Sequence, residues 1–239
     1  MADDTEIERI LVVTAHPDDV DFGVAGSVAV WTEQGIDVTY CIVTNGEAGG
    51  SDATISRAEM AAIRQAEQTA AAECVGVTDV RFLGHPDGSL QATIELRRDI
   101  SRVIREVRPQ RVVCQSPERN FQRIYASHPD HLAAGEAALC AVYPDARNQF
   151  AHTELLDEHG LEPWTVPEVW MMVGARPDVH VDTTATIDRK IKALLCHTSQ
   201  IADPDAIDTL IREWGAGIAQ GVGLPEGSFA EAFQRIETR

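Results

Sequence analysis

The sequence has little of what a membrane protein or a nucleic-acid-binding protein needs. No apolar stretch approaches the ~18 residues of a membrane-spanning helix, so we expect no membrane span. Lysine occurs only twice, and 38 acidic residues against 20 basic ones give a net charge of −18. Such a surface repels nucleic acid and anionic membranes, and neither is expected as a partner.

Cysteine is also scarce, and its pattern argues against a disulfide framework. The five cysteines are odd in number, widely spaced, and show neither zinc-ribbon nor redox spacing. Buried thiols in a reducing compartment are the better interpretation. The first residues are acidic and lack the basic and apolar regions of a signal peptide. We therefore expect a cytoplasmic protein.

What is present is an ordinary globular composition, with 44% hydrophobic and 24% charged residues. In the first 145 residues, short β-branched runs alternate with helical patterns that end at glycine or proline. Strands alternating with helices of this length predict a Rossmann-like α/β fold, with a mostly parallel sheet flanked by helices. The expected strands are 10–14, 38–44, 80–83 and 111–115, and the expected helices are 22–34, 56–75, 93–107 and 129–141.

The pattern is looser after Tyr143. Residues 144–168 contain three prolines and no clear periodicity, which predicts a long loop. Repeats, low-complexity tracts and linkers are lacking, so we expect one domain over residues 1–239, with a core at 8–142 and a C-terminal part at 143–239. The elements expected after the loop are a strand at 169–173 and helices at 187–197 and 206–219.

A polar turn rich in His, Asp or Glu follows each of the first four expected strands. The carboxyl ends of parallel strands meet at one edge of the sheet, where open α/β sheets bind their ligands. We therefore expect a single active site at the carboxyl ends of the strands. The four turns are 15–19, 45–50, 84–88 and 116–131.

Two of these turns carry extended His-Pro-Asp motifs, His-Pro-Asp-Asp at 16–19 and His-Pro-Asp-His at 128–131. A single His-Pro-Asp is more often a turn in which the aspartate caps a helix. Two extended copies at strand ends instead favour a catalytic metal, since two imidazoles and one carboxylate are the smallest ligand set that leaves positions open. Zn²⁺ is the expected ion, with Fe²⁺, Mn²⁺ or Co²⁺ as alternatives.

A third His-Pro-Asp begins at His85, and it differs from the other two. Gly88 stands three residues after this histidine, where the other copies have Asp19 and His131. Glycine offers no side-chain ligand. We therefore expect that the middle copy does not hold the ion.

Five segments of the chain follow the pattern of one known family. They are Ala15-His16-Pro17-Asp18-Asp19 with Gly23 and Gly26, then Thr44-Asn45-Gly46-Glu47, 64–77, 83–88 and 128–131. In these segments the chain resembles the LmbE-like (PIG-L) metal-dependent de-N-acetylases, which remove acetyl from N-acetylglucosamine-type substrates. The resemblance is collinear over about residues 8–142, and a weaker match runs from Lys190 to Gln200.

That resemblance implies His16, Asp19 and His131 as metal ligands and Asp18 as the general base. A metal with three protein ligands keeps a position for water and lowers the pKa of that water from ~16 toward ~7. A carboxylate beside the metal can accept the proton of the attacking water and return it to the leaving amine. The alternative role for Asp18 is a helix cap.

The resemblance also implies that His128 stabilises the oxyanion while Asp130 orients it, and the alternative role for His128 is a helix N-cap. A carboxylate on one ring nitrogen would favour a protonated His128. Arg64, Asp87 and Glu47 match positions that contact the sugar in relatives. The alternatives are a solvated surface charge for Arg64 and ordinary turn positions for the other two.

One position departs from the family pattern. Some relatives place a catalytic tyrosine two residues before the first histidine of the second motif, and here that position is Ala126. Tyr125 lies one residue earlier, and a one-residue insertion in the loop could still bring it to the site.

The expected function is that of a zinc-dependent hydrolase. It would remove acetyl from an N-acetylglucosamine-type conjugate, either a thiol-cofactor precursor or a natural-product glycoside, with a homo-oligomer as one possible state. An amidase of thiol S-conjugates is the related alternative. A non-haem iron oxygenase also uses two histidines and one carboxylate, but such enzymes are usually β-barrels. No Gly-x-Gly-x-x-Gly follows the first strand, which argues against a dinucleotide site.

Overall fold

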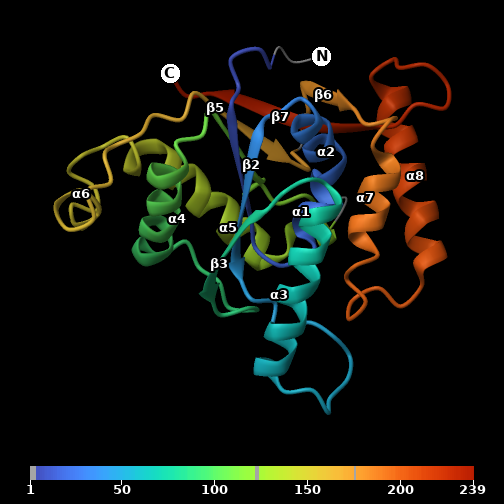
Figure 1. The fold of residues 1–239 in the computed structure, drawn as a ribbon, viewed down its shortest axis with the longest axis horizontal. Helices are drawn as coiled ribbons and strands as arrows, with labels where there is room; N and C mark the ends of the chain where they lie inside the picture. The colour runs from blue at the N-terminus through green and yellow to red at the C-terminus, as the bar shows by residue number, and fades with distance from the viewer. Residues whose placement is uncertain (1–3, 122–123, 175) are drawn as a thin grey trace.

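A computed structural model describes residues 4–121, 124–174 and 176–239. Within them, seven strands form one sheet in the order β3-β2-β1-β4-β5-β7-β6 (Figure 1). The first five strands in this order are parallel, and β7 runs antiparallel to both of its neighbours. The strands are β1 (Arg9–Thr14), β2 (Asp37–Thr44), β3 (Asp79–His85), β4 (Arg111–Gln115), β5 (Glu168–Met172), β6 (Val179–Asp182) and β7 (Ala230–Glu237).

Helices cover both faces of the sheet (Figure 1). One of the two main clusters of buried side chains lies between the sheet and the helices α2 and α3. The other lies between the sheet and the helices α4 and α5. The helices are α1 (Asp19–Gly23), α2 (Ala25–Glu33), α3 (Arg57–Cys74), α4 (Ile94–Val107), α5 (Pro129–Cys140), α6 (Glu154–Asp157), α7 (Ile187–Leu194) and α8 (Pro204–Gly221). A 3₁₀ turn spans Ile124–Ser127 and a π turn spans Ala141–Asp145.

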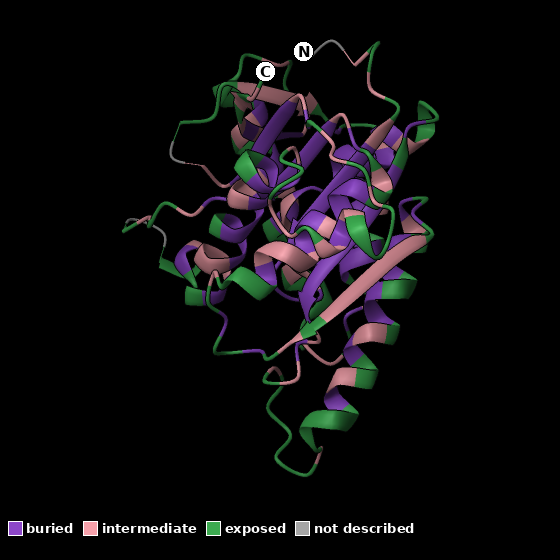
Figure 2. Cartoon of the chain, turned by 90° about the vertical axis from the view of Figure 1, so that its left-hand side faces the viewer, coloured by how far each residue is buried: buried purple, intermediate pink, exposed green. Residues whose placement is uncertain are grey.

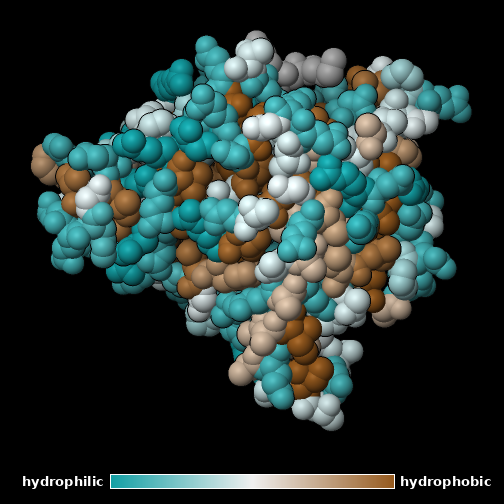
Figure 3. All heavy atoms as spheres, in the orientation of Figure 1, coloured by the Kyte–Doolittle hydropathy of each residue, from teal (hydrophilic) through white to brown (hydrophobic). Residues whose placement is uncertain are grey.

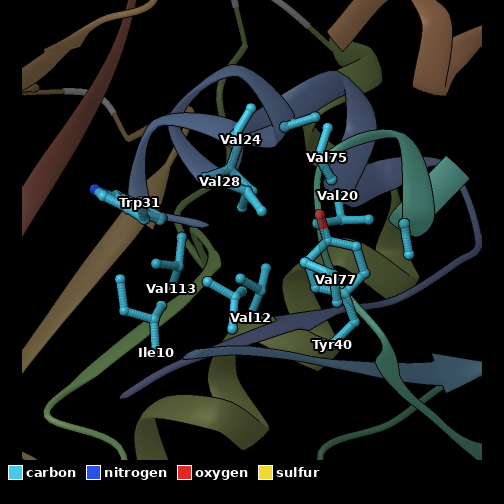
Figure 4. Packing of buried hydrophobic residues seen from close by; sticks show 14 of the residues in the cluster. Ile10, Val12, Val20, Val24, Val28, Trp31, Tyr40, Val75, Val77 and Val113 are labelled. Atoms are coloured by element: carbon cyan, nitrogen blue, oxygen red, sulfur yellow. The ribbon is translucent and has the colours of Figure 1, made fainter. Parts of the chain in front are cut away.

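The central strand β1 explains why the sheet needs helices on both sides. Ile10 and Val12 belong to the cluster beneath α2 and α3, whereas Leu11 and Val13 belong to the cluster beneath α4 and α5. Successive strand residues point to opposite faces, so an unbroken apolar run is buried on both. Figure 2 shows these central strands as buried, and Figure 4 shows Ile10 and Val12 below Val28 of α2.

The predicted α/β fold with a mostly parallel sheet is confirmed. Helix α3 begins at a capping box in which Ser56 and Glu59 bind each other's backbone N–H groups, and Thr93 caps α4. The helix expected at 22–34 is instead two helices, because the chain leaves helical geometry at Val24, where φ is −148°.

The C-terminal part differs most from the prediction. Part of the expected 144–168 loop is helical, and the strands β6 and β7 were not predicted. Strand β7 escapes a pattern search because Glu231 occupies one of its buried positions. Lys190 binds that carboxylate inside the protein, so the charge is compensated rather than excluded.

No helix among the described residues combines the length and apolar composition needed to cross a membrane. The face drawn in Figure 3 is mostly hydrophilic, in keeping with the high acidic content of the chain.

Candidate active site

The turns after β1, β2 and β3 and the start of α5 meet at the carboxyl edge of the sheet, and His16 lies at their centre. Its side chain contacts Asp19 of its own turn, Asp87 of the turn after β3, and Asp130 of α5. The rings of His128 and His131 lie 5.1 and 5.2 Å from the ring of His16. The fold therefore brings residues from three separate segments into one cluster.

The three residues expected to hold the metal lie in contact. One carboxylate oxygen of Asp19 is 3.3 Å from Nδ1 of His16, and the other is 3.0 Å from Nε2 of His131. The three side chains are between 10 and 19% exposed. Burial raises the pKa of Asp19, but the two imidazoles outweigh burial and lower it. Asp19 is therefore an ionised carboxylate between two imidazoles, which suits a metal site.

The hydrogen bonds of His16 decide which ring nitrogen faces the metal position. Nε2 lies 3.0 Å from Asp87 Oδ1 and 3.2 Å from Asp130 Oδ2, so it carries a proton. Nδ1 is then the nitrogen that faces Asp19. Burial lowers the pKa of His16, but Asp19 and Asp87 raise it to about 11, so the ring is protonated here and Nδ1 would have to lose its proton to hold a metal. A carboxylate on the outer nitrogen is the usual support of a metal-binding histidine.

Two sets of donor atoms lie within 4.8 Å of one another, those of His16, His128 and His131 and those of His16, Asp87 and Asp130, and Asp19 belongs to neither set. The second grouping is less suited to metal binding because its carboxylates already serve the protein. Asp87 accepts the N–H of Ala48, and Asp130 accepts those of Gly88 and Leu90. The donor chemistry thus fits His16, Asp19 and His131, with His128 beside them.

Asp18 is held in an unusual conformation beside this cluster. Its φ of 89° is in the left-handed region, and its N–H donates to Gln68. One carboxylate oxygen accepts a hydrogen bond from Arg64 at 3.1 Å. Burial, followed by the charge of Asp19, raises the pKa of Asp18 to about 7, although Arg64 and His197 oppose the rise. A carboxylate with this pKa can exchange a proton near neutral pH.

Arg64 is buried, so its interpretation as a solvated surface charge is wrong. It is 4% exposed and donates to the carbonyl oxygens of Pro17 and Gly46 as well as to Asp18. Gly46 has a φ of +67°, and a Cβ there would lie 2.7 Å from the Arg64 guanidinium. Arg64 therefore ties the turn after β1 to the turn after β2.

Asp87 and Glu47 are bound to each other's turns. Both oxygens of Asp87 have partners within the protein, His16 and the N–H of Ala48, which differs from the sugar-binding role expected for it. Burial raises the pKa of Asp87, but the hydrogen bond from His16 lowers it to about 2. Glu47 accepts the N–H of Asp87 and a bond from Arg57 through Oε1. Its Oε2 has no hydrogen-bond partner among the described residues.

His128 and Asp130 interact differently from the prediction. The Asp130 carboxylate binds His16 and two backbone N–H groups, and it is the backbone N–H of Asp130 that donates to Nδ1 of His128. Burial and the neighbouring histidines lower the pKa of His128, whereas a protonated ring was expected. Because Nδ1 accepts a hydrogen bond, the proton of the neutral ring lies on Nε2.

The histidine of the middle His-Pro-Asp, His85, does not join the cluster around His16. Nε2 of His85 lies 3.0 Å from Asp99 on α4, and the side chain is 20% exposed. Only Asp87 of this turn joins the cluster around His16. This geometry agrees with the expectation that the middle copy does not hold the ion, which itself stays a prediction.

A buried polar chain beneath Asp18 was missed by sequence reasoning. Gln68, which accepts the Asp18 N–H, donates to Asp21, and Nε2 of His197 lies 2.8 Å from the same Asp21 oxygen. Asp21 and His197 are fully buried. The tail match that includes His197 was the only signal, and it assigned no role because the contact spans 176 residues.

Beside Asp19 and His131 lies a cavity of about 220 Å³. Tyr125 and Ala126 both line it, and Tyr125 is otherwise 81% exposed. The remaining lining residues are Phe22, Gly23, Gln115, Ser116, Met172, Val173 and Trp214.

The family model described as "PIG-L: GlcNAc-PI de-N-acetylase" matches residues 11–142. A diacetylchitobiose deacetylase from Thermococcus kodakarensis is 32% identical, over 83% of this chain and 72% of its own. A probable N-acetyl-α-D-glucosaminyl L-malate deacetylase from Bacillus anthracis is 31% identical, over 90% of both chains.

Among solved structures, an N,N'-diacetylchitobiose deacetylase from Pyrococcus horikoshii superposes with a TM-score of 0.88. It is 26% identical and covers 98% of this chain and 85% of its own. A 4-carboxy-2-hydroxymuconate hydratase from Pseudomonas putida has a TM-score of 0.80 at 24% identity, over 97% of both chains, and shares the fold alone. One fold therefore supports different reactions, and function must be argued from the site.

Proposed function

Because the chain belongs to the PIG-L family of GlcNAc-PI de-N-acetylases, we propose that it hydrolyses the acetamide of a small N-acetylglucosamine conjugate. The observation that carries the proposal is the contact of Asp19 with His16 and His131, directly beside Asp18. These residues supply a metal site and a separate carboxylate base in one cluster. The oxygenase alternative is disfavoured, because the sheet is open, mostly parallel and covered by helices.

His16 through Nδ1, Asp19 and His131 would hold the ion, with Zn²⁺ as the default and Fe²⁺, Mn²⁺ or Co²⁺ as alternatives. When bound, a divalent ion lowers the pKa of a water molecule and polarises the amide carbonyl. Asp87 and Asp130 keep the outer nitrogen of His16 protonated and fix the ring, as supporting carboxylates do in metal sites.

Asp18 moves the proton. It accepts the proton of the attacking water, whose oxygen forms the new bond to the acetyl carbon. When the C–N bond breaks, Asp18 returns the proton to the sugar nitrogen, so the products are acetate and a free amine. His128 donates from Nε2 to the oxyanion that develops on the carbonyl oxygen, and the neutral ring suffices because Nδ1 is occupied by the backbone.

The sugar contacts are proposed for Arg64, Glu47 and Asp87. Glu47 is the clearest candidate acceptor, because its Oε2, a buried oxygen, has no hydrogen-bond partner among the described residues. For Asp87, orienting His16 is the better supported role. Whole-chain organisation as one deacetylase domain is supported by the sheet, which continues from β1–β4 into β5–β7. A cytoplasmic location and a homo-oligomer stay predictions.

The decisive experiment is an acetate-release assay on N-acetylglucosaminyl conjugates of inositol, malate and a second glucosamine. We expect turnover of at least one substrate, its loss after chelation, and its recovery on adding one divalent ion per chain. A metal-loaded protein that releases no acetate from any of them would contradict the proposal.

A further inference from the structure

The strand order divides the active-site edge into a polar side and an apolar side. Asp18 and Asp19 follow β1, which lies between β2 and β4. On the β2 side, Arg64 donates to Asp18 and to Gly46 directly after β2, and Glu47 follows there. An amide carbon beside Asp18 therefore has charged side chains on this side, which are bound to one another and to the backbone.

The β4 side is the cavity of about 220 Å³ bordered by Asp19 and His131. Its walls come from α1, the ends of β4 and β5, and α8; Figure 1 labels α1, β5 and α8. Besides Asp19 and His131, its polar lining residues are Gln115, Ser116 and Tyr125, and Gln115 is already bound to the N–H of Ala15. The apolar walls are Phe22, Met172, Val173 and Trp214.

Such a cavity suits a hydrocarbon chain better than a sugar. Hydroxyl groups placed against Phe22 and Trp214 would lose their hydration without gaining partners, which is costly. The acyl chain of the amide carries no hydroxyl groups. An acetyl methyl, however, is about the size of one water molecule, which occupies roughly 30 Å³. It would leave most of the about 220 Å³ unfilled.

Building on the proposed hydrolysis, we propose that this cavity is an acyl-chain site. The preferred substrate class is a glucosamine conjugate whose nitrogen carries an acyl chain of about four to six carbons, which fills the cavity better than acetyl. Hydrolysis of such a substrate releases a short fatty acid in place of acetate. The bonds formed and broken are otherwise those of deacetylation.

A second cavity sets the length limit. It has a volume of about 170 Å³ and shares Phe22, Gly23, Val173 and Trp214 with the first. The indole of Trp214 borders both, so its removal should join them and admit longer chains. Ala126, on the 3₁₀ turn Ile124–Ser127, also lines the first cavity, and a larger side chain there should shorten the site.

The test uses the metal-loaded protein and methyl glucosaminides that carry N-acetyl, N-butanoyl, N-hexanoyl or N-decanoyl groups, with release of the free amine as the readout. We expect kcat/KM to rise about two- to fourfold for each added methylene as far as hexanoyl, and then to fall. Trp214→Ala should shift the optimum to the decanoyl substrate, and Ala126→Phe should shift it to acetyl.

Leu210→Ala is the matched control, because Leu210 lies on α8 with Trp214 but is 51% exposed and lines neither cavity. It should keep the wild-type preference. A steady fall of kcat/KM from acetyl onward would overturn the acyl-chain site while leaving the deacetylase function intact. A preference for an N-acetylglucosamine hexyl glycoside over the methyl glycoside, without an acyl preference, would assign the cavity to the aglycone. Loss of all turnover on every substrate would instead contradict the proposed function.

Discussion

The turns that begin at His16 and His85 share the tripeptide His-Pro-Asp, yet they differ in environment and partners. The first follows β1, which has a strand on each side, whereas the second follows β3 at the edge of the sheet. The His16 side chain is 10% exposed and contacts three carboxylates, while that of His85 is 20% exposed and binds Asp99 alone among its ion-pair partners in the described residues.

The comparison shows that the two turns cooperate rather than duplicate each other. Asp87 of the second turn binds Nε2 of His16 in the first. The second turn therefore supports His16, the proposed metal ligand, and contributes no proposed ligand itself. The role of each His-Pro-Asp depends on the residue that follows it and on the position in the sheet of the strand before it.

The largest effect should separate the ligands from the middle histidine. His131→Ala and Asp19→Ala each remove one of the three proposed ligands, so we expect the purified protein to lose its ion and essentially all activity. His85→Ala should retain the ion, because among the described residues the only ion-pair partner of His85 is Asp99 on α4. Elemental analysis after dialysis measures this. Equal loss of metal in the His85 and His131 variants would require a different ligand set.

Next in size is the effect of Asp18→Asn, which should keep the metal while lowering kcat about 10²–10⁴-fold. The amide is nearly the same size as the carboxylate and can still contact Arg64, but it cannot accept the proton. Metal content and kcat should be measured on the same preparation. Near-normal turnover with bound metal would exclude Asp18 as the base.

A smaller effect should distinguish the two carboxylates that support the two histidines. Asp87→Ala removes an acceptor from Nε2 of His16 and should weaken metal binding about 10–100-fold. Asp99→Ala is the matched control, since it does the same to His85. Metal titration with a competing chelator compares the two. If Asp87→Ala keeps wild-type affinity and changes only KM for the sugar, Asp87 is a substrate contact instead.

The smallest effect should be on stability. His85→Ala breaks a partly exposed pair with Asp99 and should lower the free energy of unfolding by at most about 1 kcal/mol. Urea unfolding of the metal-free protein measures this without a contribution from ligand binding. A loss of several kcal/mol would mean that the turn after β3 supports the sheet edge more than its exposure indicates.

The fold was predictable where patterns are local. The strands expected at 10–14 and 38–44 lie within the observed β1 and β2, because buried parallel strands have unbroken apolar sequences. The helix expected at 56–75 is found as α3, because its capping residues are near in sequence. Strand β7 was missed because the burial of Glu231 depends on Lys190, which is 41 residues away.

The sequence by itself determined which turns gather at the active-site edge, because each of these turns follows a strand and parallel strands end at one edge. Only the tertiary structure decided what those residues do to one another. Asp87 and Asp130 both bind the His16 ring, and His197 is buried against Asp21. These contacts join positions 71 to 176 residues apart. Such contacts depend on how layers pack, and spacing along the chain does not encode them.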